Sequence, residues 1–103
     1  MENRFEIQGS CLTVHLPKEV DHPVSDDIRR ESDDIMRKQY IRTMVFDFSG
    51  TAFMDSSGIG VIIGRCKSMG FSGGEVAATN MNERVKKIFM VSGLQKLIRV
   101  DTV

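Results

Sequence analysis

The order of sequence patterns in this chain of 103 residues predicts an α/β domain with a mixed, partly parallel β-sheet. Two short alternating segments come first, and helical patterns then alternate with strand patterns to the end of the chain. Residues 44–48 form a nearly continuous apolar run, which is typical of a central strand covered on both faces. We therefore expect about four to five strands packed with helices, in a single domain spanning residues 1–103.

The first third of the chain begins with a predicted antiparallel hairpin. Residues 5–7 and 11–16 alternate between apolar and polar side chains, as strands with one buried face do. Gly9 lies in the turn between them, and Pro17 ends the second strand because proline cannot donate to a strand ladder. Residues 18–22 are predicted to form a connection.

A helix is predicted from Pro23 to about Lys38, since proline suits the first helical turn. Asp26 and Asp27 are expected near its N-terminus, where negative charge is favourable. The many charged side chains of this segment indicate a solvated helix face, and an acidic docking surface is the alternative. The apolar stripe of this helix consists of Val24, Ile28 and Ile35.

A second helix is predicted over residues 57–69, with glycine at three positions. An interior glycine costs a helix about 1 kcal/mol relative to alanine, so these glycines need a reason. Gly60 and Gly64 are four residues apart and share one side of the helix. They allow either close packing against a neighbouring helix or a smooth surface that a partner can approach. The expected buried face consists of Ile59, Ile62, Ile63 and Cys66.

The last third of the chain contains a weak strand pattern, a helix and a final strand. Residues 75–78 form the first of these strands. Asn80 is predicted to cap the third helix, because Glu83 follows three residues later as in a capping box. Gly93 ends this helix, and residues 97–100 are the last expected strand.

The segment around which the chain is organised is Asp55-Ser56-Ser57-Gly58, at the point where a loop becomes the second helix. Serine is favoured at a helix start because its hydroxyl accepts a hydrogen bond from a free backbone N–H. The same position tolerates a phosphate, because helix N-termini bind anions. The residues alone therefore allow two interpretations, a helix cap and a phosphorylation switch.

Composition argues against several classes of protein. The 14 basic residues balance the 14 acidic ones, which argues against a broad nucleic-acid-binding surface. No apolar run approaches the roughly 18 residues needed to cross a membrane. The polar N-terminus lacks a secretory signal, so we expect a cytoplasmic protein. Cys11 and Cys66 are too few for a disulfide framework and are predicted to be buried thiols, with a disulfide bridge or a redox pair as the alternative.

No pattern of catalytic or cofactor-binding residues is present. His15 and His22 are the only histidines; nothing in the sequence places them near the serines, and there is no Gly-x-Ser-x-Gly elbow. The glycines from Gly58 to Gly64 have the wrong spacing for a dinucleotide fingerprint, and no phosphate loop occurs. We therefore expect a protein that is not an enzyme and has no cofactor and no metal.

Several segments resemble the bacterial anti-sigma factor antagonists, whose fold is the STAS domain, and most closely their sporulation type. The Asp-Ser-Ser-Gly loop resembles the phosphorylation loop of that family. The resemblance covers roughly residues 5–100, although the first third matches poorly. The matching segments are residues 54–60, 61–65, 73–76, 85–89 and 92–94.

The resemblance implies a binding module that is switched by phosphorylation of Ser56. The implied partner is an anti-sigma factor that is also an ATP-dependent serine kinase. The unmodified antagonist binds this kinase and frees the sigma factor, phosphorylation ends the interaction, and a PP2C-type phosphatase restores it. The family also implies a protein that is a monomer when free. The alternative is a constitutive STAS module in a transporter complex or a larger signalling assembly.

The resemblance also suggests which residues contact the kinase. Asp55 is expected to shape the loop and present Ser56, and Asp21 is either a kinase-recognition residue or a helix cap. Pro17 and Lys18 replace the small residue and glycine that the family usually has before Asp21. The other predicted partner-binding residues are Ser57, Gly58, Gly60 and Gly64.

Overall fold

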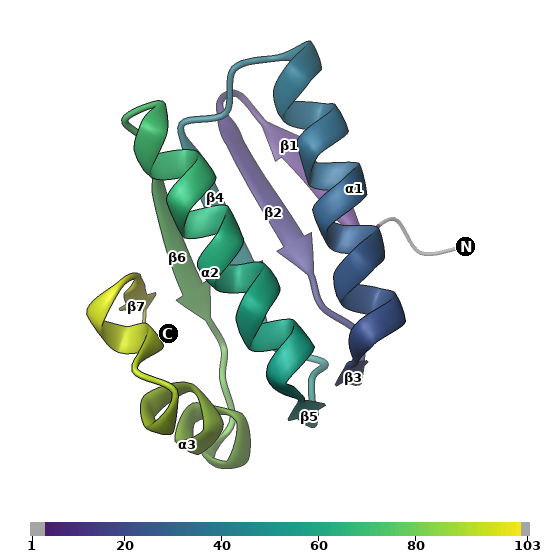
Figure 1. Cartoon of the computed structure of the whole chain (residues 1–103), viewed down its shortest axis with the longest axis vertical. Coiled ribbons are helices and arrows are strands. Elements are labelled where there is room, and N and C mark those ends of the chain that lie inside the picture. The colour runs from purple at the N-terminus through teal and green to yellow at the C-terminus, as the bar shows by residue number, and fades with distance from the viewer. Residues whose placement is uncertain (1–3, 102–103) are drawn as a thin grey trace.

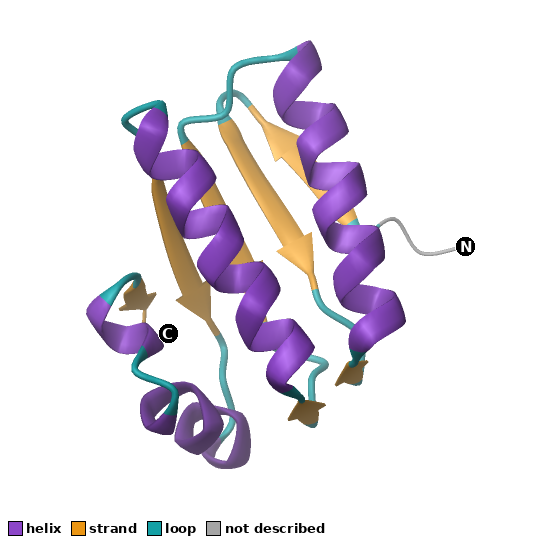
Figure 2. Cartoon of the chain, in the orientation of Figure 1, coloured by secondary structure: helices purple, strands orange, loops and turns teal. Residues whose placement is uncertain are grey.

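The computed structural model describes residues 4–101 and confirms an α/β fold. Within these residues, a five-stranded sheet has the order β1-β2-β4-β6-β7; β1 is antiparallel to β2, and the other pairs are parallel (Figures 1 and 2). The strands of this sheet are β1 (Phe5–Gln8), β2 (Cys11–His15), β4 (Thr43–Asp47), β6 (Glu75–Thr79) and β7 (Arg99–Asp101). The helices are α1 (His22–Lys38), α2 (Ser56–Phe71), α3 (Glu83–Val91) and the short 3₁₀ helix η1 (Leu94–Lys96).

The helices α1 and α2 lie side by side on one face of the sheet (Figure 1). The chain moves in one direction across the sheet from β2 to β4 to β6, and right-handed crossovers therefore place both helices on the same side. In β4, Met44 and Phe46 are buried, whereas Thr43, Val45 and Asp47 are only half-buried. The expectation that both faces of this strand are covered is therefore wrong.

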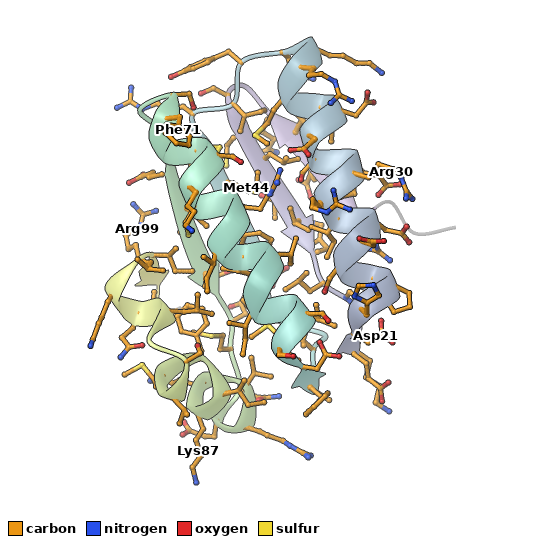
Figure 3. All side chains as sticks on the ribbon, viewed as in Figure 1. Asp21, Arg30, Met44, Phe71, Lys87 and Arg99 are labelled. Carbon is orange, nitrogen blue, oxygen red and sulfur yellow. The ribbon has the colours of Figure 1, made fainter. Side chains whose placement is uncertain are left out.

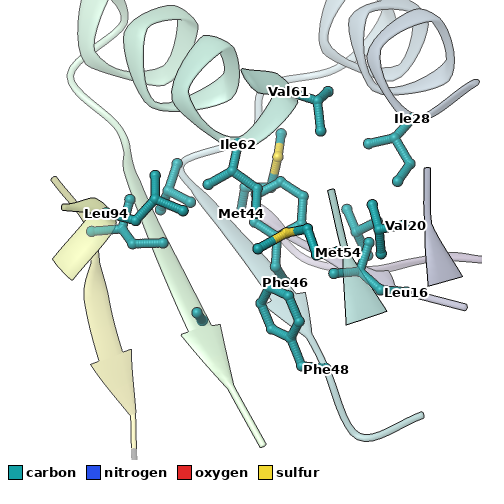
Figure 4. Packing of buried hydrophobic residues seen from close by; sticks show 14 of the residues in the cluster. Leu16, Val20, Ile28, Met44, Phe46, Phe48, Met54, Val61, Ile62 and Leu94 are labelled. Atoms are coloured by element: carbon teal, nitrogen blue, oxygen red, sulfur yellow. The ribbon is translucent and has the colours of Figure 1, made fainter. Parts of the chain in front are cut away.

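The hydrophobic core fills the space between the sheet and these two helices (Figure 4). Strand side chains such as Phe46 meet Ile62 of α2 and Ile28 of α1 in one cluster. Phe48 extends the core toward α3, where its ring packs edge-on against Phe89 with the ring centres 6.4 Å apart. This core holds the first turns of α1 and α2 in a fixed relation to the sheet.

The buried face of α2 differs from the predicted one. Ile59, Ile63 and Cys66 are half-buried, and the helix is instead turned so that Arg65 is buried, with 5% of its surface exposed. The Arg65 guanidinium forms an ion pair with Asp33 of α1 and donates to the Ser32 hydroxyl at 3.2 Å. A charged residue on the inner face is invisible to a search for apolar spacing. The buried residues of α2 are Gly58, Val61, Ile62, Arg65 and Met69.

The predicted cap of the third helix is also wrong. Asn82, not Asn80, is the N-cap of α3, and its side chain accepts from the N–H of Val85 at 2.8 Å. Glu83 is therefore the first residue of α3 and forms no capping box with Asn80. Asn80 has a left-handed backbone, with φ of 60°, and its amide donates to Asp47 at 3.0 Å.

Smaller differences concern α1, the last strand and the cysteines. Pro23 lies in the first turn of α1, but Asp26 and Asp27 lie beyond it and form ion pairs with arginines three residues later. The helix η1 delays the last strand, which begins at Arg99. Both cysteines are free but only half-buried, and burial raises the pKa of the Cys66 thiol to about 11. No helix within residues 4–101 is both long enough and apolar enough to cross a membrane.

Candidate functional site

The candidate site lies where α1 and α2 begin, and a two-stranded sheet that the sequence did not predict aligns these two starts. Strand β3 (Glu19–Val20) pairs in parallel with β5 (Phe53–Met54), and Val20 lies opposite Met54 in the register. Each strand leads directly into a helix. Asp21 and Asp55, the next residue in each segment, therefore occupy equivalent positions.

Asp21 and Asp55 cap the two helices in the same way. Both have an extended backbone, with φ near −99° for Asp21 and −93° for Asp55. Asp21 accepts from the N–H of Val24 at 3.2 Å, and Figure 3 shows it at the start of α1. Asp55 accepts from the N–H groups of Ser57 and Gly58 at 2.8 and 3.2 Å. The cap of α2 is thus an aspartate, and neither serine is needed for it.

The two serines differ in their surroundings. Ser56 is the first residue of α2 and is exposed. Ser57 is half-buried, and its Oγ lies 3.4 Å from Nδ1 of His22 in α1. Nothing in the sequence places a histidine beside these serines, and the contact becomes visible only in the fold.

The three glycines at the start of α2 have different roles. Gly58 is buried, and a Cβ there would lie 2.5 Å from Cγ of Met54 and 2.9 Å from Cγ1 of Val20. Its role is therefore internal packing against β3 and β5, and its burial argues against a direct contact with a partner. Apart from the adjacent residues and the backbone of α2 itself, no atom of the described residues lies within 4 Å of where a Cβ would be at Gly60 or Gly64. These two glycines leave an open surface and do not pack closely against a neighbouring helix.

Hollows lie on both sides of the start of α2. One, of about 270 Å³, lies between α1 and α2 and is lined by residues that include His22, Arg29, Ser57 and Gly60. The other, of about 530 Å³, lies between α2 and α3, and its lining is mostly apolar. Figure 3 shows Lys87 on α3 at this end of the molecule. The second hollow is lined by Phe53, Ile59, Arg84, Lys87, Ile88, Val91 and Ser92.

The comparison with known proteins decides the family. The STAS domain family matches residues 4–103, which is nearly the whole chain. This chain belongs to the STAS domain family.

The relatives of this STAS domain include antagonists of anti-sigma factors. It is 37% identical over 100 residues to an anti-sigma F factor antagonist of Paenibacillus polymyxa. The matched region covers 97% of this chain and 86% of the relative. The solved structure of the anti-sigma factor antagonist SpoIIAA in its unphosphorylated form is 27% identical and matches with a TM-score of 0.85, covering 95% of this chain and 86% of that one. The phosphorylated form of Bacillus SpoIIAA is 26% identical and matches with a TM-score of 0.76, covering 95% and 89%.

The pairing of Ser57 with His22 does not give this STAS domain a hydrolytic triad. His22 is exposed, and within residues 4–101 no carboxylate is hydrogen-bonded to it. The N–H groups of Ser57 and Gly58, which could have formed an oxyanion hole, are already bound by Asp55. The part of the chain that the structure describes also contains no cluster of three or more His, Cys, Asp or Glu residues that could hold a metal ion.

The other histidine of the STAS domain, His15, lies in a separate cluster at the end of β2. Its Nδ1 is 2.9 Å from Oδ2 of Asp47, and its Nε2 is 2.9 Å from Oε1 of Glu6. Burial opposes the charged form, but the hydrogen bond with Glu6, followed by that with Asp47, raises the pKa of His15. This cluster ties the edge strand β1 to the central strand β4 and takes no part in the serine loop.

The sequence carries a local signal for one feature of the site and none for another. An apolar residue followed by aspartate precedes both helices, as Val20-Asp21 and Met54-Asp55. This repeated pair is the only local trace of the small sheet that brings His22 to Ser57. The exposed apolar side chains beside the loop carried no such signal, because Phe53 and Val91 are far apart in the sequence and meet only in the fold.

Proposed function

We propose that this STAS domain is an anti-sigma factor antagonist that is controlled by phosphorylation of Ser56. Unphosphorylated, it binds an anti-sigma factor that is also a serine kinase, and the sigma factor is released. The observation that carries the proposal is the exposed Ser56 hydroxyl at the start of α2, beside a cap that Asp55 supplies alone. The similarity to an anti-sigma F factor antagonist and to SpoIIAA supports the same function, with sporulation as the favoured pathway.

The surface around Ser56 suits a protein partner. Phe53 and Val91 expose 41% and 82% of their surfaces and line the hollow between α2 and α3. Contiguous exposed apolar side chains of this kind mark interaction sites. Arg84 and Lys87 lie at the same hollow, so the docking surface of the kinase is expected to be apolar with acidic groups at its edge. Gly60 adds an open stretch of helix on the other side of the loop.

Phosphorylation is expected to change this surface and leave the fold intact. The Ser56 hydroxyl oxygen attacks the γ-phosphorus of ATP, the bond from that phosphorus to the ADP oxygen breaks, and the hydroxyl proton passes to a base of the kinase or to water. The product adds a charge of about −1.5 to −2 at neutral pH. A helix N-terminus tolerates such a charge. Beside Asp55, however, the phosphate adds bulk and like charge that repel a docked partner.

The proposal also covers dephosphorylation, the contact surface and the state of the protein. A phosphatase of the PP2C type removes the phosphate and restores binding. Asp21, Asp55 and Gly64 belong to the predicted contact surface, with Asp21 and Asp55 also serving as caps. We take residues 1–103 to form one domain, which acts in the cytoplasm, is a monomer when free, binds no nucleic acid and catalyses no reaction of its own.

The experiment that tests the proposal is intact-mass measurement after incubation with an anti-sigma kinase and ATP. Wild type should gain one phosphate and Ser56→Ala none, and Ser10→Ala, which changes another exposed serine, should behave as wild type. In a binding assay with the same kinase, Ser56→Asp should bind at least about tenfold more weakly than wild type, which corresponds to about 1.4 kcal/mol. Absence of phosphate on wild type with an active kinase would contradict the proposal and favour a constitutive STAS module.

A further inference from the structure

The two adjacent serines present a kinase with a choice between similar hydroxyl groups. Successive residues of an α-helix point about 100° apart, so the hydroxyls of Ser56 and Ser57 face different directions. Ser56 is exposed, and within residues 4–101 its hydroxyl has no hydrogen-bond partner. Ser57 is half-buried, and its hydroxyl faces His22 across the groove between α1 and α2. One hydroxyl is therefore accessible, and the other has a contact of 3.4 Å with a histidine.

The backbone places His22 beside Ser57. The pairing of β3 with β5 puts Val20 beside Met54, and the two caps, Asp21 and Asp55, follow in step. His22 is the first residue of α1 and thus lies next to the first turn of α2. The two residues are 35 positions apart in the sequence, and their side chains bridge the two helix starts.

We propose that His22 determines which serine is phosphorylated, by holding the Ser57 hydroxyl in the groove and leaving Ser56 as the acceptor. The inference rests on the proposed function, since it concerns the same phosphoryl transfer from ATP. A hydroxyl can attack only if the phosphorus atom approaches it in line with the bond that breaks. The contact with Nδ1 of His22 turns the Ser57 hydroxyl into the groove between α1 and α2, so an in-line approach to it has to enter that hollow of about 270 Å³. His22 is a positioning residue and takes no part in the chemistry.

The geometry of the hydrogen bond suggests variants of His22 that either keep or lose the contact with Ser57. The contact uses Nδ1 of His22, and an asparagine amide occupies nearly the place of Nδ1, whereas a glutamine amide occupies that of Nε2. His22→Asn should therefore preserve the contact with Ser57, and His22→Gln and His22→Ala should lose it. His22 is exposed, so none of these variants empties the core. Arg29→Gln is the matched control, because Arg29 lines the same groove without a contact to Ser57.

The test measures phosphorylation of Ser57 in a Ser56→Ala background, with the site located by fragment mass spectrometry. Adding His22→Ala or His22→Gln should raise the rate at Ser57 at least about twofold, the effect of losing a hydrogen bond at the weak end of the usual range. Adding His22→Asn or Arg29→Gln should leave that rate low. An unchanged rate with His22→Ala, while wild type takes phosphate on Ser56, would overturn this inference alone. Wild type with phosphate on neither serine would overturn the proposed function and the selection together.

A second measurement needs no kinase. The ring nitrogens of His22 are observed by ¹H–¹⁵N NMR in wild type and in Ser57→Ala. Loss of the hydroxyl should shift the signals and the tautomer balance of His22, while those of His15, which is bound to Glu6 and Asp47, stay unchanged. Identical His22 signals in the two proteins would show that the contact is not formed, and the inference would fail.

Discussion

Substituting Gly58 and Gly60 separately by alanine should have opposite effects on stability, although both lie in the first turns of α2. A Cβ at Gly58 would lie 2.5 Å from Cγ of Met54 and 2.9 Å from Cγ1 of Val20. Both neighbours are buried, and valine is stiff at its first side-chain torsion, so it cannot move aside without strain. Overpacking of this kind costs about 1–3 kcal/mol. Alanine returns about 1 kcal/mol through helix propensity, which leaves Gly58→Ala less stable by up to about 2 kcal/mol.

Gly60→Ala is the matched control. Apart from adjacent residues and the backbone of α2, no atom of the described residues lies within 4 Å of the added methyl group, so helix propensity alone should raise the free energy of unfolding, by up to about 1 kcal/mol. The assay is thermal and urea unfolding followed by circular dichroism. For a domain of this size, 1 kcal/mol corresponds to about 4–8 °C in the melting temperature. The two variants should therefore melt on opposite sides of wild type.

The variants Gly58→Ala and Gly60→Ala also distinguish a role in internal packing from a role in binding the partner. Gly60→Ala should bind the anti-sigma kinase more weakly despite its higher stability, because the methyl group stands on the open surface beside Ser56. Equal stability of the two variants would refute the assignment of Gly58 to internal packing. Tighter or unchanged kinase binding by Gly60→Ala would refute the assignment of Gly60 to the docking surface.

Two further predictions concern the His15 cluster and the cap of α2. The raised pKa of His15 means that its interactions with Glu6 and Asp47 stabilise the fold below the ordinary histidine pKa, and that this contribution is lost as pH rises through the folded-state pKa. Urea unfolding of wild type and His15→Gln should therefore differ most below the ordinary histidine pKa of about 6.5 and converge as pH rises through the folded-state pKa, and a constant difference would contradict the linkage. Asp55→Ala should lower the free energy of unfolding by about 1 kcal/mol, because two N–H groups of α2 lose their acceptor. Asp55→Asn should retain most of that stability, and equal losses in both variants would show that charge, not capping, is the contribution.

The order of elements was predictable because each long element carries its own periodicity. The alternation at β2 indicated its buried face, which includes Leu12 and Val14, and Pro23 indicated the start of α1. The pair β3 and β5 was not predictable, because strands of two residues have no period to detect. The burial of Arg65 depends on Asp33, which lies 32 residues away, so local spacing could not show it.

The candidate site divides in the same way. The Asp-Ser-Ser-Gly loop is local and was found from the sequence, whereas His22 and Val91 come from other helices and required the fold. The capping error at Asn80 has a related cause. Both asparagines suit a helix start, and Asn80 is drawn away from the helix by its bond to Asp47 of β4. The capping residue of α3 therefore depends on a contact with Asp47, which is distant in the sequence and which local spacing could not show.

Asp55 caps α2 and Ser56 would carry the phosphate, and because these are different residues, phosphorylation should not destabilise the fold. If a serine hydroxyl capped α2, phosphorylation would remove an acceptor that the helix needs, and each cycle would perturb stability. Here the Asp55 side chain accepts from the N–H groups of Ser57 and Gly58, and Ser56 is exposed and is not the acceptor of either group. A phosphate on Ser56 would therefore change charge and bulk at the surface while the cap remained. The predicted consequence is that phosphorylated and unmodified protein unfold at nearly the same urea concentration, although their affinities for the kinase differ at least about tenfold.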